Sequence, residues 1–210
     1  MSINTYAELQ TAVAAWIHRD DLTAHIPDFI QQGEALLNRK LRTVDMENVA
    51  TLTASTLSRN VSLPSGFIEM QSLWIESTRD EIQYIVPSMM ASAISTASGR
   101  PEYFTITSSI EFERVPDAEY SIECRYFKRY NLANDQTNTL LTNNPEIYLH
   151  AALSCAALFI VDDARLSMFR QLLESEINEL NLSEDRKRGS SLAVLRTELD
   201  LEPVFDIVNG

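Results

Sequence analysis

The stretch NPEIYLHAALSCAALFI, residues 144–160, decides the fold of this chain. It begins like a helix, because Asn144 can cap the first turn and Pro145 suits the first helical position. Apolar side chains then follow on every side, which is typical of a helix buried in a protein core or in a membrane. The run is shorter than the roughly 20 residues of a membrane span and contains His150 and Ser154. We therefore expect a central core helix that other helices surround.

Two amphipathic helices are predicted before this stretch. Thr5 and Glu8 form a capping box, and apolar residues at three- and four-residue steps extend a first helix to about His18. A second helix, with a proline in its first turn, runs to about Arg42. Gly33 lies within this second helix and indicates a place where another helix approaches closely.

From residue 48 the spacing at which apolar residues recur falls from about 3.6 residues to 2, and Thr, Ser and Val become common. This change predicts an inserted unit of antiparallel β-strands. A short helix capped by Ser88 is expected to interrupt the unit over residues 88–97. The expected strands cover residues 50–54, 60–63, 67–76, 81–86, 103–107, 110–114 and 120–130.

The pattern after the insert predicts a polar loop over residues 132–144, the central helix, and one more amphipathic helix from Leu166. No Gly or Pro lies at residues 161–164, so the two helices could form a hairpin or one long bent helix; we favour a hairpin with an aspartate as cap. After Asn181 the helical pattern lapses. The last residues carry apolar side chains without a helix start, and Pro203 interrupts them. They are expected to form an arm.

The predicted fold class is therefore α+β. A helical bundle of two N-terminal and two C-terminal helices carries an inserted antiparallel β unit and an extended C-terminal arm. The expected domains are a discontinuous helical domain of residues 1–47 and 132–185, a β domain of residues 48–131, and the arm of residues 186–210.

Composition excludes several classes of function. The net charge of −13 argues against unspecific nucleic-acid binding and against docking on an anionic membrane surface. It fits a protein that meets acidic polymers without adhering to them, or one that docks on a basic partner. Cys124 and Cys155 lie in apolar segments and are expected to be buried and reduced, with a disulfide between them as the open alternative. The first residues have no secretion-signal pattern, so secretion is not expected.

The residues that could carry chemistry form no recognisable catalytic, cofactor-binding or metal-binding set. His150 follows Glu146 by four residues, a spacing that does not match a di-metal helix motif. His18 and His25 flank the turn between the first and second predicted helices, without the spacing of a zinc site. Asp162 and Asp163 are expected to cap a helix. The motifs of serine hydrolases, phosphate-binding loops and dinucleotide sites do not occur. The sequence therefore predicts a protein that is not an enzyme and has no cofactor.

Several segments, in their order and spacing, resemble the head-to-tail adaptor (connector) proteins of tailed bacteriophages. The segments that carry the resemblance are Ile26–Ile30 with Glu34–Ala35, Asn38–Arg42, Leu63–Pro64 with Gly66–Phe67, Gly99–Tyr103, Asn143–Leu153, Asp162–Arg165 and Arg188–Ser190. Each motif alone is weak, but together they span nearly the whole chain.

The resemblance implies a structural virion protein that assembles in the host cytoplasm. Its expected partners are the portal protein, neighbouring copies in a dodecameric ring, and a downstream tail, nozzle or stopper protein. DNA is expected to pass through the ring without specific binding, and no membrane is involved. The residues expected to dock on the portal lie on the arm: Arg186, Lys187, Arg188, Leu192, Leu195, Arg196, Leu199, Val204 and Phe205.

Two alternatives stay open at this point. One is another tail-completion or stopper protein of similar build, and the other is a protein-binding module outside phages. The basic run Arg186–Arg188 is ambiguous in the same way, because it fits either a solvated helix end or a docking contact. Trp16 and Trp74 are expected to be core or interface residues.

Overall fold

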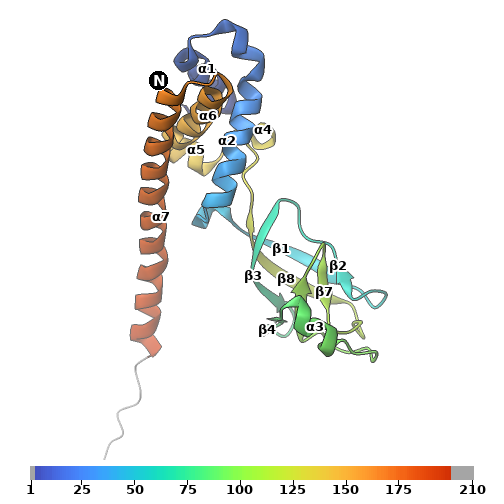
Figure 1. Cartoon of the computed structure of the whole chain (residues 1–210). Coiled ribbons are helices and arrows are strands. Elements are labelled where there is room, and N and C mark those ends of the chain that lie inside the picture. The colour runs from blue at the N-terminus through green and yellow to red at the C-terminus, as the bar shows by residue number, and fades with distance from the viewer. Residues whose placement is uncertain (1–2, 200–210) are drawn as a thin grey trace, which may run out of the picture. The chain divides into compact units, whose positions relative to one another are not determined.

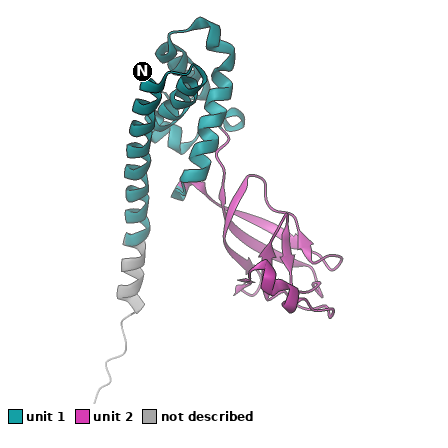
Figure 2. Cartoon of the chain, viewed as in Figure 1, with its two compact units in different colours: residues 1–44, 132–210 teal, residues 45–131 magenta. Residues whose placement is uncertain are grey.

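The computed structural model describes residues 3–199, with only the backbone for residues 190–199. The chain divides into two compact units (Figure 2). The first unit combines both ends of the chain, up to Val44 and from Leu132 onward, and the second spans Asp45–Asn131. The fold is α+β, as predicted.

The first unit is helical (Figure 1). Its elements are α1 (Tyr6–Ile17), the 3-10 helix η1 (Asp20–His25), α2 (Ile26–Lys40), α4 (Leu132–Asp135), α5 (Thr139–Asn143), α6 (Pro145–Phe159) and α7 (Asp163–Leu199). The capping box of Thr5 and Glu8 is confirmed at the start of α1. The polar loop predicted between the insert and the central helix is wrong in detail, because that segment contains α4 and α5.

The central helix α6 is the core of this unit, as predicted. It packs against α1, α2 and α7. Pro145 occupies its first turn, but Asn144 makes no side-chain capping bond, which corrects that part of the prediction. Gly33 of α2 lies against the backbone of α6, so a Cβ there would stand 3.0 Å from the Ala151 carbonyl carbon and the Ala152 nitrogen. The predicted close approach is confirmed.

A tight turn joins α6 to α7, so the favoured hairpin is confirmed. The predicted aspartate cap is Asp162, whose Oδ1 accepts a hydrogen bond from the backbone N–H of Arg165 at 3.1 Å. Helix α7 then continues to Leu199, which corrects the predicted lapse of the helix after Asn181. The segment is rich in helix-forming Leu, Arg, Ala and Glu, and the single Gly189 costs only about 1 kcal/mol in a helix.

The second unit contains two four-stranded sheets. In the first sheet the strand order is β1 (Glu47–Ala54), β8 (Tyr120–Lys128), β3 (Phe67–Ile75) and β4 (Asp80–Glu81). In the second sheet it is β2 (Asn60–Val61), β7 (Ile110–Phe112), β6 (Tyr103–Ile106) and β5 (Gln83–Tyr84). All pairs are antiparallel except β5 with β6, which are parallel and correct the purely antiparallel prediction.

The core of the second unit lies on the inner faces of its strands. Alternate residues of β8, namely Ile122, Cys124 and Tyr126, are buried there as the sequence pattern predicted. The expected short helix is α3 (Pro87–Ala93), and Ser88 does not cap it, because Val86 is the capping position and Pro87 begins the helix.

Candidate interaction surfaces

A buried carboxylate fixes the place where the chain re-enters the helical unit. Glu34 of α2 accepts two hydrogen bonds at Oε1, from the Leu132 backbone N–H at 2.8 Å and from the Tyr148 hydroxyl at 3.1 Å. The Tyr148 hydroxyl in turn accepts a bond from Asn138 Nδ2 at 2.7 Å. Burial raises the pKa of Glu34, and these hydrogen bonds partly offset that rise. The network ties α2, α6 and the returning chain together.

Polar contacts also hold α7 against the rest of the unit. Glu174 pairs with Lys40 of α2, and Glu176 binds Nδ1 of His150 at 2.8 Å. Glu184 is buried, and its Oε2 accepts the backbone N–H of Val44 at 2.7 Å. Burial alone would raise the pKa of Glu184, but its hydrogen bonds and nearby cations outweigh this effect and lower it.

The basic run of α7 has mixed surroundings. Lys187 pairs with Glu184 at 2.5 Å, and the Arg188 guanidinium donates to the carbonyl oxygen of Arg42. Arg186 is exposed. Two of these three predicted docking residues therefore already have partners within the chain, and the third faces solvent.

The remaining predicted docking residues lie further along. Gly189 lies on an open face of α7, because a Cβ there would meet no atom within 4 Å. Leu192, Leu195, Arg196 and Leu199 are on the helical backbone beyond it, whereas Val204 and Phe205 lie outside the described residues.

The histidines and cysteines form no chemical centre. His150 is partnered by Glu176 rather than by Glu146, and its ring also contacts Trp16 and Phe169. Cys124 and Cys155 are free thiols, and burial raises the pKa of Cys124 to about 11. Among the side chains that the structure describes, no cluster of three His, Cys, Asp or Glu residues is arranged to hold a metal ion.

An exposed apolar surface lies where α6 meets α7. We call it the hairpin tip and define it as Leu158, Phe159, Val161, Asp162 and Asp163. Leu158 and Phe159 are each 56% exposed and Val161 is 79% exposed. The Phe159 ring is anchored on one side by His25 and Phe29, at ring-centroid distances of 5.3 and 5.4 Å. The tip therefore presents apolar groups beside two carboxylates.

Val161 is also conformationally strained. Its φ is +57°, in the left-handed region that glycine normally occupies after a helix. The turn closes through the Asp162 N–H, which donates to the Ala157 carbonyl oxygen at 3.0 Å. A β-branched residue in this region costs roughly 1–2 kcal/mol. The chain thus holds an exposed valine where a glycine would be more stable.

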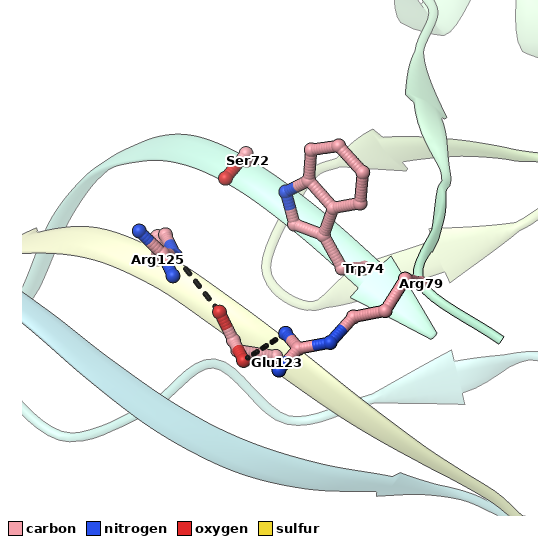
Figure 3. A pocket seen from close by; sticks show the side chains of 5 residues that line it. All are labelled: Ser72, Trp74, Arg79, Glu123 and Arg125. Carbon is pink, nitrogen blue, oxygen red and sulfur yellow. Dashed lines mark hydrogen bonds and ion pairs between the residues drawn. The ribbon is translucent and has the colours of Figure 1, made fainter. Parts of the chain in front are cut away.

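The second unit carries a hollow of about 330 Å³ on the outer face of its β1–β8–β3–β4 sheet (Figure 3). We call it the Trp74 hollow. Strand pairing builds it, because Trp74 faces Glu123 and the neighbouring β3 and β8 positions are also paired. Its lining is Ser72, Trp74, Arg79, Glu123 and Arg125.

The hollow carries a small excess of positive charge. Glu123 lies between two arginines, with Arg79 at 3.0 Å and Arg125 at 2.8 Å (Figure 3). The bond from Arg125 is the main cause that lowers the pKa of Glu123, and Arg79 adds to it. Arg79 and Arg125 remain 69% and 54% exposed, so both have donors available beside the Trp74 ring.

A second hollow of about 440 Å³ has a mixed polar and apolar lining and lies between residues of β3 and the β5–β6 pair. Its lining is Phe67, Ile68, Glu69, Met70, Gln71, Tyr84, Phe104 and Ile106. Neither hollow was expected from the sequence, apart from the interface role considered for Trp74. The hairpin tip was also missed, although three apolar residues next to two aspartates were a usable signal.

A family model described as SU10 adaptor protein matches residues 4–196, which covers both units and most of α7. No curated protein matches the chain. Among the described residues, no helix is long and apolar enough to cross a membrane.

Proposed function

The chain belongs to the SU10 adaptor protein family, and from that premise we propose that it forms the ring that joins portal and tail in a phage particle. Membership supports a structural bacteriophage adaptor with no enzymatic role. The match over residues 4–196 is the observation that carries the proposal, because it includes both units rather than one shared module.

In this proposal, neighbouring copies form a closed dodecameric ring with the portal protein on one side and a downstream tail, nozzle or stopper protein on the other. A ring of this kind repeats one head-to-tail contact between two different surfaces. The net charge of −13 per copy supports a passage that DNA crosses without being held.

The portal contact is proposed to lie on the arm. The open space at Gly189, together with the residues Leu192, Leu195, Arg196 and Leu199 that follow it in the sequence, supports this placement. Arg186 is exposed next to them. Lys187 and Arg188 contribute less directly, since each already binds a group within the chain.

A three-dimensional image reconstruction of purified phage particles tests the proposal. We expect a ring of this chain directly beneath the portal, with residues after Arg188 in contact with portal subunits. If the chain is absent from the particles, or lies at the distal end of the tail, the proposed function is wrong. Replacing carboxylates that line the passage tests the DNA role, because unchanged DNA ejection would contradict it.

A further inference from the structure

The hairpin tip combines two features that are both unfavourable in an isolated chain. Val161 is strained at φ +57° and is 79% exposed, and Leu158 and Phe159 beside it are also exposed. Strained residues persist where another requirement fixes them, and they cluster at functional sites. Contiguous exposed apolar groups mark surfaces that contact a partner. The valine side chain therefore points to a contact that one copy alone does not make.

The same chain has a surface of complementary chemistry. The Trp74 hollow offers an aromatic ring beside two exposed arginines that share Glu123, and Glu81 lies opposite Trp74 in β4. The tip offers apolar groups next to the exposed carboxylate of Asp163, whereas Asp162 already pairs with Arg165 at 3.5 Å. Tryptophan and arginine are the residues most enriched where protein interfaces carry their binding energy.

We propose that the hairpin tip of one copy docks into the Trp74 hollow of the neighbouring copy. Val161 and Phe159 pack against the Trp74 ring, and the Asp163 carboxylate approaches Arg79 and Arg125. Because each copy carries one tip and one hollow, the contact is heterologous and repeats from copy to copy. This inference rests on the proposed ring, for which it supplies one interface.

Cysteine cross-linking in assembled particles tests the contact directly. The native thiols are poor competitors, because burial raises the pKa of both Cys124 and Cys155. A variant with Val161→Cys and Ser72→Cys places one thiol on the tip and one in the hollow. The matched control combines Val161→Cys with Leu57→Cys, which lies on a fully exposed loop of the same unit.

After mild oxidation we expect the first variant to give a ladder of covalently linked multimers on a non-reducing gel, and the control to give monomer. A monomer in both variants, or a link within one chain, would overturn the contact. Absence of the chain from the particles is a different result, because it contradicts the proposed function as well.

Val161→Gly provides a second test with opposite effects on two readouts. Glycine relieves the strain, so the purified chain is expected to melt at the same or a higher temperature, while its incorporation into particles falls several-fold. Gln136→Gly is the control, because Gln136 has a φ of +62° outside the tip and should leave incorporation unchanged. Normal incorporation of the Val161→Gly chain would contradict the proposal.

Discussion

The helices α6 and α7 are neighbours in the chain but are covered very differently. α6 is buried on nearly every side over Ile147–Ala157. The described side chains of α7 bury one seam, formed mainly by Phe169, Leu173, Ile177 and Glu184, and leave Leu182 and other apolar groups exposed. The comparison indicates a division of labour, in which α6 determines whether the helical unit folds and α7 keeps surface available for partners.

The largest difference between α6 and α7 is expected when a charged residue is introduced into each helix. Leu153→Asp in α6 should unfold the helical unit, because an unpaired buried charge costs several kcal/mol out of a typical total of about 5–15 kcal/mol. Leu182→Asp in α7 should change the free energy of unfolding by about 0.5 kcal/mol or less, since Leu182 is exposed. Circular dichroism during thermal unfolding measures both, and a folded Leu153→Asp chain would show that α6 is not the core.

A smaller effect is expected from the same substitution at two glycines. Gly33→Ala brings a Cβ to 3.0 Å from backbone atoms of α6, which cannot rotate away. Such overpacking costs about 1–3 kcal/mol, whereas alanine gains about 1 kcal/mol in helix propensity. We therefore expect a net loss of stability in urea unfolding.

Gly189→Ala is the matched variant on α7. Its Cβ meets no atom within 4 Å, so the gain in helix propensity, about 1 kcal/mol at most, should appear without a packing cost. If Gly33→Ala and Gly189→Ala shifted the urea midpoint equally, the two glycines would not differ in how closely other helices pack against them.

The difference in burial between α6 and α7 also explains which parts of the fold the sequence predicts. The apolar run of α6 and the alternation of Ile122, Cys124 and Tyr126 in β8 are local patterns, and both give the correct element and the correct buried face. The end of α7 is a poor prediction because residues 183–191 carry no apolar side chain, so the helical pattern is interrupted before Leu192, Leu195 and Leu199 resume it. Its backbone stays helical through residues that are each acceptable in a helix.

The candidate surfaces were harder to predict, because they depend on contacts distant in the sequence. The Trp74 hollow exists because β3 and β8 pair in a register that puts Trp74 opposite Glu123, and register is not visible in either strand alone. Similarly, Glu34 was noted only as part of a family motif. Its role follows from Leu132 and Tyr148, about one hundred residues away.

Two buried glutamates should respond to pH with opposite signs. Burial raises the pKa of Glu34 in the folded state, so its favourable contribution is present below the unfolded value near 4.5 and is lost as pH rises through the folded value. The pKa of Glu184 is lowered, so its contribution is present above the unfolded value and is lost as pH falls through the folded value.

Glutamine at each position separates the two effects. Glu34→Gln should increase the free energy of unfolding at neutral pH, because its Oε1 can still accept both bonds, and the gain should shrink near pH 4.5. Glu184→Gln should lower stability at neutral pH by about 1–3 kcal/mol through weaker bonds to Val44 and Lys187. Urea unfolding at the two pH values measures both, and effects of the same sign would contradict the assignment.

Removing residues 190–210 should have the smallest effect on stability and the largest effect on assembly. The last described side-chain contact of α7 is the bond from Arg188 to Arg42, and Gly189 already faces open space. The truncated chain should therefore unfold within a few degrees of the full chain, yet fail to bind purified portal protein. Leu57→Asp is the control, since Leu57 is 92% exposed in the second unit and the variant keeps the arm. If truncation unfolds the helical unit, the distal part of α7 belongs to the core and the contrast with α6 is lost. If portal binding survives, the portal contact lies elsewhere on the chain.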